Sequence, residues 1–233
     1  MANLYSISRL MVGALRHGNH GAVTDEAGWT PVATLVALPR FVSLGADQQS
    51  IQDVIRTEHK KRFETEIRGG DLYIRVKQGW SLSSGVILER ALPDVSAARL
   101  PDFLVHASFL QYQQSILSHG LLCGSRLQEI GGPSRSHVHW FPCKSITLLE
   151  TQRVPKSGKT MLVVVRPKVL EAHGVRMFQA QPQQLGWYGA VLTDVVGPRL
   201  FEQVLDRGTR IATEEWLEAL QLEMAERQSL SFV

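Results

Sequence analysis

Cysteine is scarce in this sequence, which contains Cys123 and Cys143 as its two thiols among 233 residues. Two thiols cannot build the disulfide network that stabilises small secreted domains, and a chain of this length buries a core without one. No apolar run is long enough to cross a bilayer, and the N-terminus lacks the apolar core of a signal peptide. We therefore expect an intracellular protein, cytoplasmic or nuclear, that does not insert into membranes.

Several motifs that define large enzyme classes are also missing. The sequence has no Walker-type phosphate loop, no G-x-G-x-x-G dinucleotide fingerprint and no G-x-S-x-G nucleophile elbow. P-loop and serine-hydrolase functions therefore lack support. His137, His139 and Cys143 lie within one short segment, and His106 is a further imidazole, but their spacing matches no standard zinc pattern. We predict no metal site.

The excess of basic over acidic residues is small. The chain has 25 Lys and Arg against 22 Asp and Glu, a formal net charge of +3, and a hydrophobic content of 44% that is ordinary for a globular protein. This balance permits an anionic partner, such as a nucleic acid, but a solvated surface gives the same numbers.

An amphipathic helix is predicted from Ile7 to Gly18, because apolar residues recur at i, i+3, i+4, i+7 and i+8 and a glycine follows as the stop. The helix ends by presenting Arg16 and His17 side by side. One interpretation is that two basic side chains favour the negative end of a helix dipole. The other is that this pair belongs to a site whose further members come from later segments.

The N-terminal third resembles a winged-helix arrangement. Thr30-Pro31 predicts the N-cap and first residue of a short helix that Pro39 ends, and a third helix is expected from about Asp47. Alternating apolar residues from Arg62 to Val76 predict a hairpin with a turn at Gly69-Gly70-Asp71. Three helices followed by a hairpin are typical of winged-helix domains.

The remainder of the chain predicts an α+β lobe. The expected strands are Phe103–Ser108, Ser136–Phe141 (with His137 and His139 on one face), the fully apolar Met161–Val165, which should lie mid-sheet, and Val191–Thr193. The expected helices are 112–119, 169–173 and 213–227. We accordingly expect domains at 1–81 and 102–233, joined by a connector at 82–101.

Four scattered basic residues suggest an anion site without a metal. Arg16, His17, Arg75 and Arg135 all lie at the ends or edges of predicted elements. The planar guanidinium group matches two phosphate oxygens and stays charged, so converging arginines would form a strong phosphate site. The alternative is that each arginine makes a separate surface ion pair worth little. Sequence spacing does not decide between these interpretations.

The order of motifs resembles the NAD-dependent RNA 2′-phosphotransferase family. The matching elements, in chain order, are Leu15-Arg16-His17 (L-R-H), the Asp25–Val32 segment, Lys60–Phe63, Arg75–Ser81 (R-x-x-Q-G-H-S), His106-Ala107-Ser108 (H-G-T), Arg135–Trp140 (R-x-H-V-H-L) and Gly189–Thr193 (G-V-x-L-T). Each motif is weak alone, but together they cover nearly the whole chain in the family order.

The resemblance implies both a fold and a reaction. It implies an N-terminal winged-helix lobe, a C-terminal ADP-ribosyltransferase-like lobe and a cleft between them. It implies removal of an internal 2′-phosphate from RNA, from spliced tRNA in particular, with NAD consumed. Arg16, His17, Arg75 and Arg135 match the family's catalytic set, and the residues matching its NAD-binding segments are Gln78, Gly79, Ser81, His106, Ser108 and His139. We expect a monomer.

The sequence departs from the family mainly in the segments implied to bind NAD. Trp80 replaces a histidine, Ala107 a glycine, Ser108 a threonine and Trp140 a leucine. An indole nitrogen cannot accept a hydrogen bond, although the ring of Trp80 could stack on adenine or nicotinamide. Two rival functions follow: an ADP-ribosyltransferase acting on nucleic-acid phosphate ends, and a winged-helix nucleic-acid-binding protein that has lost catalysis.

Overall fold

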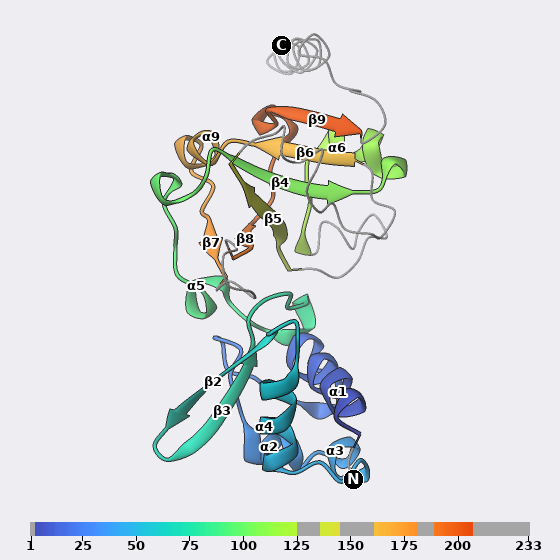
Figure 1. Ribbon diagram of the computed structural model, residues 1–233. Coiled ribbons are helices and arrows are strands. Elements are labelled where there is room, and N and C mark those ends of the chain that lie inside the picture. The colour runs from blue at the N-terminus through green and yellow to red at the C-terminus, as the bar shows by residue number, and fades with distance from the viewer. Residues whose placement is uncertain (1–2, 125–135, 145–160, 181–188, 207–233) are drawn as a thin grey trace, which may run out of the picture. The chain divides into compact units, whose positions relative to one another are not determined.

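The computed structural model describes residues 3–124, 136–144, 161–180 and 189–206, and the side chain of Leu82 is outside this description. The chain divides into two compact units (Figure 1). Unit 1 takes the described residues of Met1–Asp94, Cys123–His137 and Phe178–Ala190, and unit 2 takes those of Val95–Leu122, Val138–Met177 and Val191–Val233. Both units therefore combine segments that are distant in sequence, whereas the sequence suggested the contiguous ranges 1–81 and 102–233.

The first helix of unit 1, α1, spans Leu4–His17 and confirms the predicted helix. The side chain of Asn3 caps its N-terminus, and Gly18 follows with φ 63°, a left-handed conformation that glycine adopts without steric cost. Four residues of the predicted apolar stripe are buried, namely Ile7, Met11, Ala14 and Leu15, and the fifth, Leu10, is half-buried. Because Gly18 ends the helix sharply, Arg16 and His17 form its last turn, with Arg16 half-buried and His17 exposed.

The segment after α1 differs from the prediction at both of its prolines. Thr30–Pro31 form strand β1, which pairs with Ile74 and Tyr73, and helix α2 follows at Val32–Val36. Pro39 does not end that helix but begins another, α3, which spans Pro39–Ser43. Proline is as well suited to the first position of a helix as to the position after its end, so the sequence alone left the choice open and the prediction was wrong.

The third predicted helix is confirmed as α4, Gln48–Thr57. Its start is fixed by a capping box, in which the Asp47 carboxylate accepts from the Ser50 backbone N–H and the Ser50 hydroxyl accepts from the Asp47 N–H. The Ser50 backbone hydrogen bond lowers the pKa of Asp47. This stabilisation is therefore lost as the pH falls through the lowered native pKa.

The predicted hairpin is also confirmed. Strands β2 (Phe63–Arg68) and β3 (Asp71–Val76) pair antiparallel around Gly69 and Gly70, and β1 adds to β3 to give the order β1-β3-β2. Figure 1 shows the hairpin extending beyond the helices of unit 1. Ile74 and Val76 are buried beneath it, so the intervening Arg75 projects from the opposite face.

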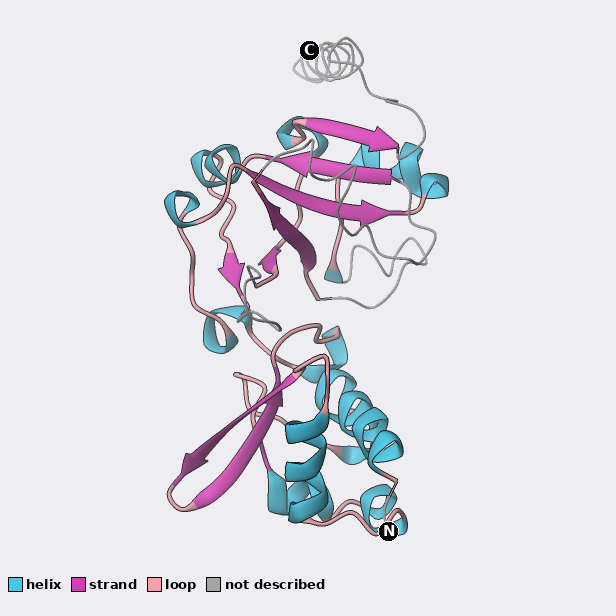
Figure 2. Cartoon of the chain, viewed as in Figure 1, coloured by secondary structure: helices cyan, strands magenta, loops and turns pink. Residues whose placement is uncertain are grey.

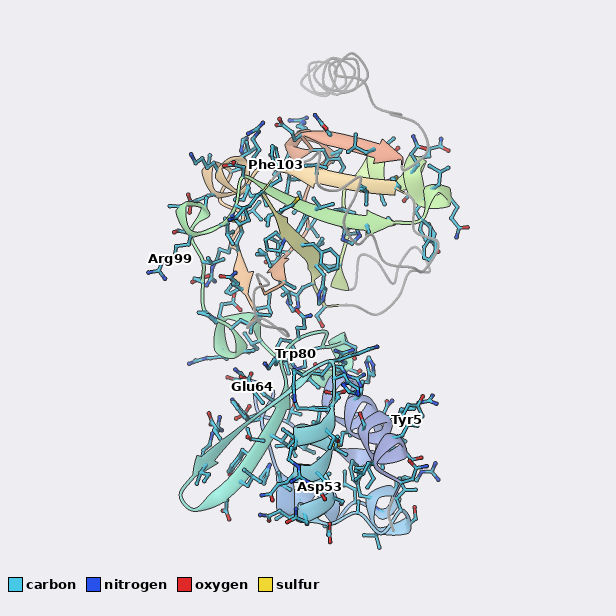
Figure 3. All side chains as sticks on the ribbon, in the orientation of Figure 1. Tyr5, Asp53, Glu64, Trp80, Arg99 and Phe103 are labelled. Carbon is cyan, nitrogen blue, oxygen red and sulfur yellow. The ribbon has the colours of Figure 1, made fainter. Side chains whose placement is uncertain are left out.

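Trp80 is a core residue of unit 1 (Figure 3). Its indole packs against Gly28, where a Cβ atom would come within 3.0 Å of the indole Nε1. Gly28 also has φ +84°. The ring therefore occupies the space above a glycine backbone, which is a different role from the stacking on NAD that the sequence suggested.

Gly28→Ala is expected to destabilise unit 1 by roughly 2–4 kcal/mol, because it adds left-handed strain and a clash with Trp80. Gly45→Ala is the matched control, since Gly45 has φ +63° and nothing within 4 Å of the added Cβ. The control should lose about 1–2 kcal/mol from strain alone. Urea denaturation measures both variants, and equal losses would show that the Trp80 contact is not tight.

Short helices follow the Gln78–Ser81 segment. These are η2 (Leu82–Ser84), α5 (Leu88–Ala91) and η3 (Ala97–Arg99), and the region expected as a connector is therefore partly helical. Asp94, at the end of the first segment of unit 1, forms an isolated β-bridge with Phe178 of the short strand β7 (Phe178–Gln179). This bridge attaches a late segment of the chain to unit 1.

Unit 2 is built on an antiparallel sheet, whose strands are drawn in magenta in Figure 2. In the order in which they pair, the strands of this unit are β8 (Val191–Thr193), β5 (Val138–Cys143), β4 (Phe103–Ser108), β6 (Met161–Val165) and β9 (Gln203–Asp206). Its helices are η4 (Leu110–Tyr112), α6 (Gln113–His119), α9 (Pro167–Ala172) and η5 (Pro198–Leu200). The prediction that Met161–Val165 lies mid-sheet is confirmed, because all five of its residues are buried.

The predicted strand Ser136–Phe141 begins two residues later than expected. Because β5 starts at Val138, His137 precedes the strand and does not share a strand face with His139. The predicted helix 213–227 lies outside the described residues. The α+β class is confirmed by the mixture of helices and sheets. Within the described parts of the chain, no helix combines the length and the apolar character needed to span a bilayer.

Candidate functional site

The C-terminal end of α1 is held by the loop that follows β3. The carbonyl of Arg16 accepts hydrogen bonds from the Ser81 backbone N–H at 3.0 Å and from its hydroxyl at 3.3 Å. The carbonyl of His17 accepts from the Ser83 hydroxyl at 3.0 Å, and the two hydroxyls lie 2.8 Å apart. The last carbonyls of a helix have no partner within the helix, so this loop supplies what α1 lacks.

Gly79 brings the same loop against the side chain of Arg16. A Cβ atom at Gly79 would lie 3.2 Å from both Cζ and Nε of Arg16, and the backbone has φ +89°. Glycine is therefore required at this position for two reasons: its backbone adopts a positive φ without steric cost, and the absence of a side chain lets the Arg16 guanidinium approach closely. Two motifs about sixty residues apart in the sequence, Leu15-Arg16-His17 and Gln78-Gly79-Trp80-Ser81, meet at this point.

The loop also determines which atoms two predicted NAD-binding residues, Ser81 and Gln78, can offer to a ligand. The Ser81 side chain is buried, and its hydroxyl is engaged by Arg16 and Ser83. Ser81 therefore positions α1 in this structure. The side-chain oxygen of Gln78 is buried and accepts no hydrogen bond from the described residues. Sequence reasoning did not identify Ser83, which no motif includes.

Arg75 is held on the outer face of the hairpin by contacts on three sides. Its Nε donates to the carboxylate of Glu64, the residue directly opposite on β2 (Figure 3). Its Nη1 donates to the carbonyls of Ala27 and Ala91, both at 2.9 Å. The guanidinium also stacks on the ring of Trp29, with Cζ 4.4 Å from the ring centroid. Glu64 and Trp29 were not among the predicted site residues.

These contacts limit what Arg75 can offer to a ligand. With Nε and Nη1 engaged, Nη2 is the guanidinium nitrogen that makes no hydrogen bond to the described residues. The sequence suggested that Arg75 binds phosphate through two guanidinium nitrogens. In the structure, the two N–H groups of Nη2 are the donors that Arg75 can offer to a phosphate. A role in catalysis stays a prediction, and Arg75 in addition links the hairpin to the turn at Ala27 and to the end of helix α5 at Ala91.

Arg75→Ala should lower the free energy of unfolding of unit 1 by about 2–4 kcal/mol, because Glu64 would remain partly buried without its cation. The side chains of Arg75 and Glu64 are 13% and 16% exposed. Arg68→Ala is the control, since Arg68 stacks on the same Trp29 ring but is 38% exposed, and it should cost less than about 1 kcal/mol.

The double variant Arg75→Ala/Glu64→Ala should recover part of the stability lost in Arg75→Ala, because it also removes the stranded carboxylate. Thermal or urea unfolding measures all three variants. If the single and double variants are equally unstable, the ion pair does not couple the two strands as the structure indicates.

The fourth predicted cation, Arg135, lies outside the described residues. Its neighbour Ser136 belongs to unit 1 and donates to the Trp80 carbonyl, from the backbone N–H at 3.5 Å and from the hydroxyl at 3.2 Å. Trp80 lies between Gly79 and Ser81. Ser136, the second residue of the R-x-H-V-H motif, is therefore anchored to the same loop that holds Arg16, and a site role for Arg135 stays a prediction.

In unit 2, the orientation of His106 is fixed by its own sheet. The Nδ1 of His106 lies 2.9 Å from the His139 carbonyl, which can only accept, so Nδ1 carries the proton. In the neutral ring Nε2 is then the acceptor nitrogen. The ring edge packs on Trp140, with the centroids 6.0 Å apart. His106 and Ser108, two residues apart on β4, project from one face of the sheet.

Trp140 is fully buried and supported by a polar chain. Its Nε1 donates to the Thr193 hydroxyl at 2.9 Å, and that hydroxyl donates to the Asp194 carbonyl at 3.0 Å. The polar groups of this chain are therefore satisfied, as buried polar groups must be. Trp140 was noted in the sequence as a departure from the family, and its supporting residue Thr193 lies in another of the family motifs.

The third predicted NAD-binding residue of unit 2, His139, does not share a sheet face with His106 and Ser108. His139 follows Val138 and precedes Trp140, so its side chain projects from the face opposite to His106. Ala107 also faces that side, where it belongs to an apolar cluster with Val105 and Leu162. His139 contributes its carbonyl to the orientation of His106. Among the described residues no group of three His, Cys, Asp or Glu side chains is placed to hold a metal.

Comparison with known proteins identifies relatives over most of the chain. The family model described as RNA 2′-phosphotransferase, Tpt1 / KptA family, matches residues 2–183. The chain is 33% identical over 142 residues to the human protein named tRNA 2′-phosphotransferase 1. This alignment covers 58% of this chain and 50% of the human protein. It is 30% identical over 176 residues to proteins named probable RNA 2′-phosphotransferase from Pseudomonas savastanoi pv. phaseolicola and Pseudomonas syringae pv. tomato.

The extent of these matches differs between relatives. The match to each Pseudomonas protein covers 75% of this chain and 83% of the relative. The chain spans about half the length of the human relative that it matches. The matched residues 2–183 include the whole Arg16–Ser81 region and His106.

Proposed function

Because the chain belongs to the RNA 2′-phosphotransferase (Tpt1 / KptA) family of transferases, we propose that it removes an internal 2′-phosphate from RNA with consumption of NAD. The observation that carries the proposal is the docking of Gly79 and Ser81 on the Arg16–His17 end of α1. Two family motifs that are distant in sequence form one cationic terminus there. A tRNA is the proposed substrate, in line with the name of the human relative, and the family resemblance of the motifs points to a spliced tRNA in particular.

The proposed reaction has two steps, in which NAD is a substrate. An oxygen of the RNA 2′-phosphate forms a bond to the nicotinamide-bearing ribose carbon, and nicotinamide leaves with the bonding electrons. The product is RNA carrying ADP-ribose on its 2′-phosphate. The neighbouring ribose hydroxyl then attacks phosphorus, and the RNA 2′-oxygen leaves and takes up a proton. The final products are 2′-OH RNA and ADP-ribose 1″,2″-cyclic phosphate.

We assign the phosphate to the cationic residues of unit 1. Negative charge gathers on the phosphate oxygens in the second step, and preorganised cationic donors stabilise such charge most effectively. The guanidinium of Arg16 is placed by Gly79, and the backbone of His17 is fixed through Ser83. His17 is then suited to hydrogen-bond the phosphate or to move the proton. Arg75 and Arg135 complete the proposed set, Arg75 through Nη2.

We assign NAD to residues whose donor and acceptor atoms suit a dinucleotide. His106 offers an imidazole whose tautomer is set by the His139 carbonyl, so its Nε2 is suited to accept from a ribose hydroxyl. Ser108 lies on the same strand face with a hydroxyl. In unit 1, Gln78 presents a buried amide oxygen with no partner among the described residues, which suits an amide or hydroxyl donor. These features support a nicotinamide dinucleotide as the second substrate.

We further propose that unit 1 is a winged-helix lobe and unit 2 an ADP-ribosyltransferase-like lobe. The helices α1, α2 and α4 and the β2–β3 hairpin support the first assignment. The antiparallel sheet around β4 and β5, which carries His106 and Trp140, supports the second. Both assignments are consistent with the order of the family motifs.

Incubation of the protein with a 2′-phosphorylated RNA oligonucleotide tests the proposal. With NAD present, we expect loss of the 2′-phosphate and release of nicotinamide in equal amounts, and neither without NAD. Mass spectrometry of the RNA measures the first and liquid chromatography the second. An RNA product that keeps its phosphate and gains ADP-ribose would instead identify an ADP-ribosyltransferase, and an unchanged RNA that still binds would identify a non-catalytic nucleic-acid-binding protein.

A further inference from the structure

We propose that the exposed face of α1 is a track for the RNA strand that leads away from the 2′-phosphate. The inference rests on the proposed function and extends it to a further surface. Arg16 is the one residue of this surface that belongs to a family motif. We name this surface the α1 strip, defined as Tyr5, Arg9, Gly13 and Arg16 together with His20, which lies over it. Its occupant is a single-stranded segment of RNA.

The α1 strip is one continuous face of the helix. Residues four and seven positions apart lie on the same side of an α-helix, so Tyr5, Arg9 and Arg16 are aligned along about 16 Å of its length. Tyr5 is 70% exposed, lies at the outer edge of α1 in Figure 3, and carries Arg9 over its ring at 6.0 Å. The opposite face, with Ile7 and Met11, is buried in unit 1.

His20 adds to the strip between Arg9 and Arg16. The missing side chain at Gly13 leaves room there, and the positions nearest to a Cβ on Gly13 are Asn19 Nδ2 at 3.7 Å and His20 Nε2 at 3.9 Å. His20 is exposed and has φ 64°, a conformation that costs a non-glycine residue energy. The turn after α1 therefore folds two polar side chains back over the strip.

The charge of the strip matches a polyanion. Helix α1 contains no Asp or Glu, and Arg9 makes no ion pair with any described residue. The basic loop after α4 contacts α1 at Ser8, which is buried and lies outside the strip, with Arg62 Nη2 3.4 Å from the Ser8 hydroxyl. His59, Lys60 and Lys61 of this loop are exposed. Glu58 is an acidic residue near Ser8, but its carboxylate is paired with Arg62 and its side chain is 8% exposed. Glu58 therefore adds little negative charge to the surface of the helix.

An aromatic ring between cations is the pattern that suits a single strand of RNA. Phosphates are attracted to the cations, and a base can stack on an exposed aromatic ring whatever its sequence. Arg16 is both the last cation of the strip and the first residue of the proposed phosphate site. An RNA strand that places its 2′-phosphate at Arg16 can therefore continue along α1 toward Arg9 and Tyr5.

Steady-state kinetics on two substrates tests this inference. The probes are a single-stranded RNA decamer with one internal 2′-phosphate and a 2′-phosphorylated dinucleotide. We expect Arg9→Ala and Tyr5→Ala each to raise KM for the decamer about fivefold or more at low salt while leaving KM for the dinucleotide unchanged. Arg9→Ala should also reduce the dependence of log KM on log salt by about 0.7. Arg99→Ala, an exposed arginine of unit 2, should change neither value.

The outcomes separate this inference from the proposed function. Equal effects on both substrates, or none on the decamer, would overturn the inference while leaving the proposed reaction intact. If the wild-type protein converts neither substrate, the proposed function fails, and the fluorescence anisotropy of a labelled decamer then tests the strip alone. Binding that weakens in Arg9→Ala but not in Arg99→Ala would support the strip, and equal binding would reject it.

Discussion

Arg16→Ala is expected to reduce kcat/KM for 2′-phosphate removal by at least about 100-fold while the melting temperature stays within a few degrees. One preorganised donor to a developing anion typically contributes a factor of about 10²–10³. Arg16 lies at the last turn of α1 with its guanidinium against Gly79, and its loss leaves the buried stripe of the helix intact. Arg16→Lys should restore little, because an ammonium group cannot reproduce the planar donor geometry.

Arg40→Ala is the control for Arg16→Ala, because Arg40 is an exposed arginine of unit 1 on α3. It should leave both activity and melting temperature unchanged. The measurement is single-turnover loss of phosphate from a labelled RNA at saturating NAD. An Arg16→Ala variant with more than a third of wild-type activity would remove Arg16 from the proposed site.

Gly79→Ala is expected to lower kcat/KM about tenfold or more through displacement of Arg16. The added methyl would lie 3.2 Å from Cζ and Nε of Arg16, so the guanidinium must shift. Small displacements of a group that contacts the reacting phosphate are costly, and about 1 Å can cost 10²-fold. The variant should also lose about 1–2 kcal/mol of stability, because alanine is strained at φ +89°.

Gly85→Ala separates the two effects of the Gly79 substitution. Gly85 has φ +69° and nothing within 4 Å of an added Cβ, so alanine there brings the strain without touching Arg16. Both variants should lose similar stability, but Gly85→Ala should keep full activity. If the two variants lose activity equally, the effect comes from the backbone of the loop and the contact of Gly79 with Arg16 is irrelevant.

The elements that were predicted correctly are those in which local signals agree. The apolar stripe and Gly18 of α1, the start of α4 near Asp47 and the Gly69-Gly70 hairpin each combine a periodicity with an end signal. The buried run of β6 is similar, since five consecutive apolar residues need cover on both faces. Local sequence is enough where both kinds of signal are present.

The errors lie where one residue suits two conformations. Pro39 was expected to end a helix and instead begins α3, and Thr30–Pro31 was expected to start a helix and instead pairs with β3. That pairing depends on Ile74 and Tyr73, more than forty residues away. A contact of this range is decided by tertiary structure, and no local pattern reports it.

The sequence named candidate residues for the site but not their contacts, and the roles of these residues stay predictions. Motif order identified Arg16, Arg75, Ser81 and His106, but it did not reveal that Glu64 engages Arg75 or that the Ser81 hydroxyl caps α1. Residues such as Ser83 act through backbone carbonyls, and a hydroxyl that bonds to a carbonyl leaves no signature in spacing. Arg135 lies outside the described residues, so its placement beside the other cations stays a prediction.

The fate of a labelled phosphate tests the central claim most directly. An RNA oligonucleotide carrying one ³²P-labelled internal 2′-phosphate is incubated with the protein and NAD, and the labelled products are separated by chromatography. If the protein transfers the RNA phosphate to ADP-ribose, the label will leave the RNA in a cyclic phosphate of ADP-ribose, and this transfer will depend on NAD and on Arg16. Label released as inorganic phosphate, or transfer that persists without NAD, would contradict the account.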